Sequence, residues 1–149
     1  MPSIPPPVLT SLGYLLLKAG AQFHQLTDQT LSDLGLTGRH FLVLTFLAED
    51  DVLSQAELGR RLGIDPTIVV GLLDELEGRR LLDRRRDPAD RRRHLLELTS
   101  DGRKVQRRAS EAMSSAEQEF LAPLPARERE TVRKALLAVM RRRLAWLAD

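Results

Sequence analysis

The segment from Leu53 to Glu77 constrains the fold of this chain most, because it specifies two short helices and the turn between them. Ser54 opens a Ser-x-x-Glu capping box, in which the Ser hydroxyl accepts from the backbone amide of Glu57 and the Glu carboxylate returns to the Ser amide. Gly63 ends this helix, and Asp65-Pro66 supplies an N-cap and a proline suited to the first helical position. A turn of about three residues between two helices predicts a helix-turn-helix, with an ordinary helical hairpin as the alternative.

A basic hairpin is predicted directly after this helix pair. Two arginine triplets flank Asp87-Pro88-Ala89-Asp90, and apolar-rich runs lie on either side of the basic segment. Asp-Pro is typical of a turn, so we expect it to fold the two triplets back on each other as strands. The side chains of Asp87 and Asp90 are expected to bond nearby amides and to pair with neighbouring arginines. Residues 51–54 predict a small third strand.

The positive charge of the chain is concentrated in this hairpin. The whole chain has a net charge of +2, but residues 79–94 contain eight arginines and three aspartates, so the remainder is slightly acidic. Such a concentration indicates a polyanionic partner. A helix-turn-helix followed by a basic hairpin predicts a winged helix that binds double-stranded DNA, with the helix from Pro66 to Glu77 in the major groove. A solvated hairpin without a partner is the alternative.

Long helices are predicted on both sides of the winged helix. Apolar residues from Leu9 to Leu26 recur at spacings of three and four, which predicts one helix from Val8 to about Leu34 with Gly35 as its stop. Before it, "IPPP" (residues 4–7) is expected to be extended. Thr37 is the expected N-cap of a further helix that ends near Glu49.

The C-terminal third predicts two more helices. Thr99 is the expected N-cap of a helix to about Leu121, "APLP" breaks it, and a last helix carries an apolar stripe from Val132 to Leu147. The predicted fold is mainly α with a small β-hairpin wing, in one domain over residues 1–149. Because a chain of this length would struggle to cover both terminal stripes, we predict a homodimer through helices at about 8–34 and 100–148, with the winged helix-turn-helix at about 37–99.

Composition narrows the function classes. The chain is 42% apolar and has no cysteine, which favours a folded protein without disulfides and indicates a cytoplasmic setting. No apolar run is long enough to span a membrane, and the N-terminus does not resemble a signal peptide. His24, His40 and His94 fall on three different predicted elements, which disfavours a histidine-based metal site, although one stays an alternative. No catalytic motif or cofactor-binding loop is present, so we predict that the protein is not an enzyme and needs no cofactor.

The segment "LDRRRDPADRRRHLLELTSDG" (residues 82–102) resembles the wing of the multiple-antibiotic-resistance regulator (MarR) family, in which Asp-Pro-x-Asp-Arg-Arg precedes a strand ending Leu-Thr-x-x-Gly. "LSQAELGRRLGI" (53–64) and "LGLTGRHFLVLTFLAE" (34–49) are similar to the preceding helices of that family. The resemblance implies a homodimeric transcriptional regulator, and we expect a repressor that binds a DNA inverted repeat and responds to a small-molecule effector. A winged-helix interaction module without a specific DNA target is the alternative.

The resemblance and the side-chain chemistry give two sets of candidate site residues. The candidate DNA-binding residues are Ser54, Gln55, Asp65, Pro66, Thr67, Val70, Arg84, Arg85, Arg86, Asp87, Asp90, Arg91, Arg92 and Arg93. The effector candidates are Tyr14, His24 and His40, whereas Phe23 and Phe41 are expected to pack in the core. The first half of the predicted recognition helix, from Asp65 to Gly71, has no Arg, Asn or Gln for a bidentate base contact. We therefore expect weak base readout there, with sequence preference coming largely from the wing and DNA shape.

Overall fold

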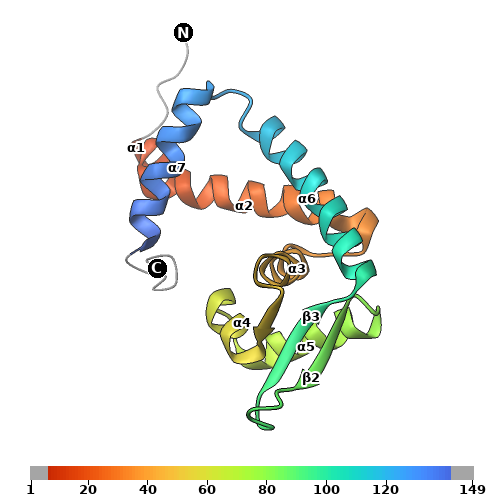
Figure 1. Cartoon of the computed structure of the whole chain (residues 1–149). Coiled ribbons are helices and arrows are strands. Elements are labelled where there is room, and N and C mark those ends of the chain that lie inside the picture. The colour runs from red at the N-terminus through yellow and green to blue at the C-terminus, as the bar shows by residue number, and fades with distance from the viewer. Residues whose placement is uncertain (1–6, 142–149) are drawn as a thin grey trace.

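A computed structural model describes residues 7–141 of the chain and shows two parts, a winged helix at one end and long helices at the other (Figure 1). The elements in chain order are α1 Pro7–Thr10, α2 Leu12–Leu31, the 3₁₀ helix η1 Ser32–Leu34, α3 Gly38–Asp50, β1 Val52–Ser54, α4 Gln55–Leu62, α5 Pro66–Gly78, β2 Leu82–Arg86, β3 His94–Leu98, α6 Ser100–Phe120 and α7 Ala126–Arg141. The mainly helical fold with a small wing is as predicted.

The winged helix is built from α3, α4, α5 and a three-stranded antiparallel sheet in the order β1-β3-β2. Leu44, Leu58, Leu73 and Leu96 are fully buried where these elements meet, so helices and sheet share one core. The predicted N-caps are confirmed, because Thr37, Ser54, Asp65 and Thr99 each precede a helix and each accept a backbone amide of its first turn.

The turn of the helix-turn-helix is as short as predicted. Gly63 ends α4 with a φ of 61°, a left-handed conformation that most other residues adopt only at a cost. Asp65 then caps α5, and Pro66 occupies its first turn. Val69 of α5 is buried beside Gly59 of α4, where a β-carbon would lie 3.9 Å from Val69 Cγ2, an ordinary contact distance, so the crossing does not require a glycine.

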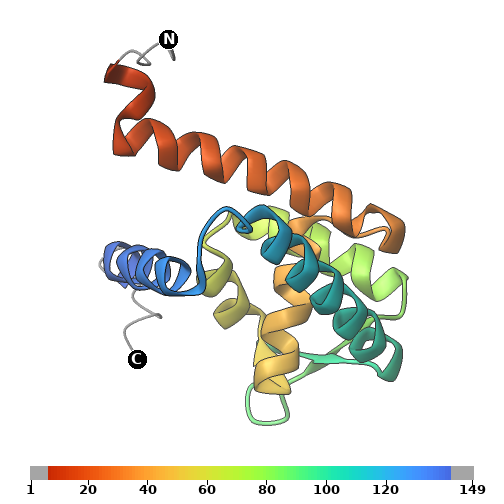
Figure 2. The ribbon, with the colours of Figure 1, turned by 90° about the horizontal axis from the view of Figure 1, so that it is seen from above.

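The long helices leave apolar surface uncovered. The Phe23 ring of α2 meets the Phe120 ring of α6 edge to face, with centroids 5.3 Å apart. In contrast, Leu12 is 73% exposed and Leu17 70% exposed on α2, and no described residue of α7 is buried. Helix α7 crosses α2 in Figure 1 but stands apart from it in Figure 2.

Two details of the N-terminal prediction are wrong. The predicted single helix from Val8 is divided at Ser11, whose extended backbone ends α1 and whose hydroxyl accepts the amide of Tyr14 at 3.3 Å to cap α2. Pro7 was expected to be extended and instead begins α1, which proline tolerates because the first helical amide needs no acceptor. The rest of "IPPP" and the end of the C-terminal stripe, including Leu147, lie outside the described residues.

The Ser54 capping box is only half formed. Ser54 Oγ accepts the Glu57 amide at 3.1 Å, as predicted. The Glu57 carboxylate forms ion pairs with Arg60 and with Arg61, whose Nε lies 3.2 Å from Oε1. Two cationic side chains one turn further along the same helix attract the Glu57 carboxylate more strongly than the single backbone amide of Ser54 does. Glu57 therefore stabilises α4 along its length.

The junction between the wing and α6 depends on a close backbone approach. Thr99 donates its amide to Leu81 O at 3.1 Å and its hydroxyl to Arg80 O at 2.7 Å, and the same hydroxyl accepts the Gly102 amide at 2.9 Å. A β-carbon on Gly102 would lie 1.8 Å from Leu81 O, a distance that no side chain can occupy. The Leu-Thr-x-x-Gly motif therefore fastens α6 to the base of the wing.

Candidate DNA-binding site

The first two turns of helix α5 present mostly apolar and small side chains on their outer side, next to the wing. Its inner side is buried through Val69, Leu72, Leu73 and Leu76, which fixes the orientation of the helix. The Asp65 carboxylate accepts the Thr67 amide at 2.8 Å, so this carboxylate is occupied by its capping role. Thr67 and Gly71 then lie on the side that faces away from the core, and Val70 beside them is 39% exposed.

The wing tip is held by its two aspartates. The Asp87 carboxylate accepts the Ala89 amide at 2.9 Å, and the Asp90 carboxylate accepts the Arg92 amide at 3.0 Å. A backbone bond of 3.0 Å from the Asp87 amide to Arg93 O closes the loop. The predicted bonds to nearby amides are thus confirmed. The predicted aspartate–arginine pairs at the tip are not formed in the described structure, because both carboxylates already cap turns.

The second arginine triplet lies on this loop and not on a strand. Strand β2 ends at Arg86, which pairs with His94 at the start of β3, so residues 87–93 form the tip. Arg91, Arg92 and Arg93 are all exposed, and none forms an ion pair within residues 7–141. The prediction that both triplets lie on strands is wrong for the second one, because a seven-residue loop replaces the tight turn. The loop places three unpaired guanidinium groups at the far end of the wing.

The arginines of the first triplet point to opposite faces of the sheet, because side chains alternate along β2. Arg84 shares a face of the sheet with buried Leu82, so its side chain reaches α5. Its Nε donates to Glu77 Oε2 at 2.9 Å, and its Nη2 contacts both Glu77 and Asp74. The hydrogen bond that Arg84 donates to Glu77 raises the pKa of Arg84 above its usual value, although partial burial opposes this, and Asp74 adds to the rise.

Arg84 therefore braces the wing against α5. With its charge compensated by two carboxylates, it is poorly placed to neutralise a phosphate, and a DNA contact from it stays an untested prediction. Arg85 and Arg86 are exposed. The same contacts pair the Asp74 carboxylate with Arg84, which reduces its repulsion of a nearby phosphate.

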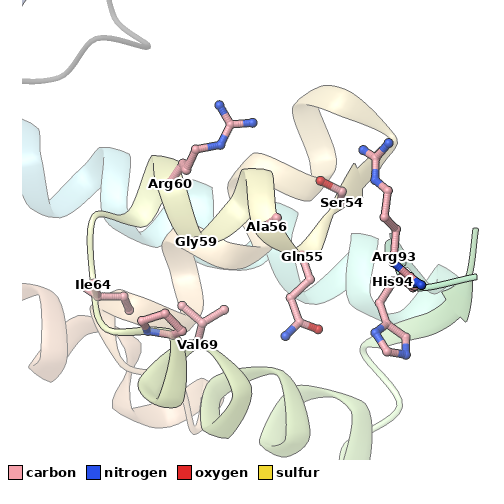
Figure 3. A pocket seen from close by; sticks show the side chains of 11 residues that line it. Ser54, Gln55, Ala56, Gly59, Arg60, Ile64, Val69, Arg93 and His94 are labelled. Atoms are coloured by element: carbon pink, nitrogen blue, oxygen red, sulfur yellow. The ribbon is translucent and has the colours of Figure 1, made fainter. Parts of the chain in front are cut away.

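A groove of about 560 Å³ runs between α4, the start of α5 and the wing. Its lining includes Gln55, Pro66, Arg92, Arg93 and His94. In Figure 3 the Gln55 side chain extends from α4 toward α5, and His94 lies on the wing side of the groove. Ser54 also lines it, but its hydroxyl is occupied by the Glu57 amide. Gln55 has the carboxamide that can bond adenine in bidentate fashion, which the α5 surface lacks.

Two of the three effector candidates lie together. His24, His40, Ile68, Gly71 and Glu75 are among the residues that line a second pocket, between α2, α3 and α5. His24 is exposed, whereas His40 is 6% exposed. Tyr14 lies elsewhere on α2, with the Lys18 ammonium 5.6 Å from its ring centroid.

His40 joins the start of α3 to the recognition helix. Its Nδ1 accepts the Thr37 amide at 3.2 Å, which completes a capping box. Its Nε2 lies 3.0 Å from Glu75 Oε2, within contact distance but out of line for a hydrogen bond. This contact between α3 and α5 was not predicted from the sequence, because nothing in the local pattern pairs residues so far apart.

The expected core role of Phe23 and Phe41 is confirmed, since both are partly buried against the main core. They also border a smaller pocket of about 380 Å³ with Met113 of α6. Arg79 is a further residue that the sequence analysis missed. It donates to Gly35 O at 2.7 Å and to Leu34 O at 2.8 Å, and so joins the end of α5 to the end of η1.

Residues 7–141 contain no cluster of three or more His, Asp or Glu side chains that could hold a metal ion. Within that range, no helix is both long enough and apolar enough to cross a bilayer.

A helix-turn-helix joined to a basic two-stranded wing defines the class of winged-helix DNA-binding proteins. The sequence profile of the MarR family matches residues 34–93, which span α3, the helix-turn-helix, β2 and the wing loop and end just before β3. The transcriptional repressor Rv2887 of Mycobacterium tuberculosis is 32% identical over 125 residues, covering 84% of this chain and 90% of that protein. The transcriptional repressor NicR of Pseudomonas putida is 34% identical over 95 residues, covering 64% of this chain and 60% of that protein.

Structural comparison gives the same result. The chain is similar to BpsR of Bordetella bronchiseptica, with a TM-score of 0.81 and 29% sequence identity over 91% of this chain and 97% of that one. BpsR is described as a protein whose DNA binding is regulated by 6-hydroxynicotinic acid. The chain belongs to the MarR family of DNA-binding transcriptional regulators.

Proposed function

We propose that this regulator is a homodimeric repressor whose two winged helices bind an inverted repeat in double-stranded DNA. The observation that carries the proposal is the wing loop, where Arg91, Arg92 and Arg93 are exposed and form no ion pair within residues 7–141. Three like charges on one short loop repel each other, and phosphates relieve that repulsion while releasing counterions. Arginine also fits a narrow, electronegative minor groove.

The proposed dimer follows from the uncovered apolar surface. On the N-terminal helices Val8 is 62% exposed and Leu17 70% exposed, and on α7 Leu136 is 43% exposed and Val139 56% exposed. A second copy that brings its own terminal helices would bury both surfaces at once. Two-fold symmetry of the protein then requires two equivalent half-sites, which is an inverted repeat.

The proposed effector site is the pocket between α2, α3 and α5 that His24 and His40 line. A small molecule bound there would touch a dimerisation helix and the recognition helix together, so its binding would change their relative position. The regulation of BpsR by a small aromatic acid supports an effector for this chain. A role for Tyr14 would need the partner subunit, since it lies away from this pocket.

The domain arrangement and setting complete the proposal. Residues 1–149 form one domain, with dimerisation helices at about 8–34 and 100–148 around a winged helix-turn-helix at about 37–99. The protein acts in the cytoplasm, where it reaches the chromosome, and its role is regulatory and not catalytic, as the names of its relatives support.

The test is selection of bound duplexes from a random DNA library, followed by sedimentation of the complex. We expect recovery of a sequence with two-fold symmetry and a complex of two chains per duplex. Recovery of no preferred duplex, with retention on neither DNA nor heparin in moderate salt, would instead support a winged-helix module that binds another protein.

A further inference from the structure

We infer that α5 reads the C5-methyl groups of pyrimidines in the major groove, those of thymine and of 5-methylcytosine alike, through apolar contact. This inference rests on the proposed DNA binding and names the chemical feature that the recognition helix detects. Thymine carries this methyl group in the major groove and cytosine does not. Methylation of cytosine places an equivalent methyl group on the edge of a C·G pair.

The side chains at the outer side of α5 match that feature. Val70 is 39% exposed beside the outward row that begins at Thr67. Ile68, on the other flank of that row, is 40% exposed and also borders the pocket between α2, α3 and α5. The core is already filled by Val69 and Leu72 on the opposite side of the helix, so packing within the chain does not explain the exposed branched side chain of Val70. Pro66, which is also exposed, extends the apolar surface to the start of the helix.

Two carboxylates beside this surface are committed to the fold, whereas Glu75, one turn after Gly71, is 67% exposed and lies against His40. The Asp65 carboxylate is occupied by the Thr67 amide at 2.8 Å, and the Asp74 carboxylate is paired with Arg84. Neither is therefore a ready acceptor for a cytosine amino group. Methyl and methylene groups are what the first two turns of α5 present to a base edge, with the Thr67 hydroxyl as the polar exception.

Gly71 is the second, independent observation. It lies inside a regular helix, where glycine is less stable than alanine. A β-carbon built on it would have no atom within 4 Å, so nothing in the described chain requires its absence. Gly71 lies on the outward row one turn after Thr67 and also borders the pocket that His24 and His40 line. Its missing side chain allows a surface bound on the outward side to approach the helix backbone closely. The proposed DNA is that surface, and close approach brings Val70 within contact of the methyl groups.

The first experiment uses the duplex selected from the random library, with each thymine replaced in turn by deoxyuridine, which lacks only the methyl group. At positions under α5 we expect about a fourfold loss of affinity for each methyl that is buried on binding, and no loss at positions outside the half-sites. A duplex with cytosine at a position where thymine is preferred should bind more weakly, and 5-methylcytosine at the same position should restore the lost affinity. The Val70→Ala variant should lose the preference. Equal binding of the thymine and uracil duplexes would overturn the inference.

The second experiment separates folding from recognition. Gly71→Ala should raise the thermal stability of the free protein while weakening its binding to the selected duplex. Gly78→Ala is the matched control, since Gly78 is also helical and also has open space around it, but ends α5 away from the apolar surface. It should gain stability and keep its DNA affinity. Unchanged DNA affinity in Gly71→Ala would contradict the close approach.

The two levels of the argument fail differently. If the wild-type protein selects no duplex at all, the proposed function is wrong. If it selects a duplex but is indifferent to the methyl groups and to Gly71→Ala, the proposed function stands and the methyl readout is wrong.

Discussion

Removing Arg91 and Arg92 should flatten the salt dependence of DNA binding. Both side chains are exposed on the wing loop and unpaired within residues 7–141, so each is free to neutralise one phosphate per subunit. Each neutralised phosphate contributes a slope of roughly −0.9 in log K against log salt, so the double Ala variant should lose about 1.8 in slope for each winged helix that is bound. Over a fourfold rise in salt, this difference corresponds to roughly a tenfold difference in the loss of affinity per winged helix.

The assay is fluorescence anisotropy with the selected duplex at several salt concentrations. Arg107→Ala with Arg108→Ala is the matched control, because both arginines are exposed on α6 and the change in net charge is the same. That control should change the DNA affinity slightly through the electrostatic field of the whole protein, and it should leave the slope of log K against log salt nearly unchanged. Equal slopes for the wild type and the wing variant would refute the reasoning and assign the loop arginines to solvent. Circular dichroism and sedimentation should show unchanged helix content and dimerisation.

The remaining predictions concern the fold and its assembly. Gly102→Ala should cost about 3 kcal/mol or more in unfolding free energy, because the new methyl group would overlap Leu81 O; chemical denaturation measures it, and a change under 1 kcal/mol would be inconsistent with this backbone approach. In a double-mutant cycle, Arg84→Ala and Glu77→Ala should show a coupling energy of about 1 kcal/mol, a value limited by solvent because both side chains are partly exposed. Absence of coupling would show that Arg84 is not held by Glu77 and is available to bind phosphate. Deleting residues 1–26 should give aggregation or unfolding, and a soluble, folded monomer by analytical ultracentrifugation would contradict the proposed dimer.

Base substitution across the selected site tests the predicted weakness of the recognition helix. A bidentate pair contributes about 1–3 kcal/mol of discrimination, and positions 65–71 contain no side chain that can form one. Each base change under α5 should therefore reduce the binding free energy by about the value of one methyl contact. Changes in the A·T-rich flanks under the wing should reduce it more. A loss of several kcal/mol under α5 would direct attention to Gln55, the nearby carboxamide in the groove.

Local chemistry made much of the fold predictable. A cap joins residues two or three positions apart, so Thr37, Asp65 and Thr99 could be assigned without knowledge of any distant contact. The helix-turn-helix followed from two such caps and from Gly63, and the wing followed from a turn motif between two apolar runs. Where the local rule failed, at the Glu57 half of the capping box, a competing pair of cations lay on the same helix.

The tertiary structure decided which role each of several residues of the same type has. Six arginines between positions 84 and 93 are equivalent in sequence, but the alternation of β2 turns Arg84 toward α5, where two carboxylates compensate its charge. Only the fold brings His24 and His40 to one pocket, and only the fold reveals that Gly102 faces a carbonyl whereas Gly71 faces open space. The physical reason is range: the sequence alone determined structure held by neighbours along the chain, whereas the function of a charged or missing side chain depends on what lies across from it in space.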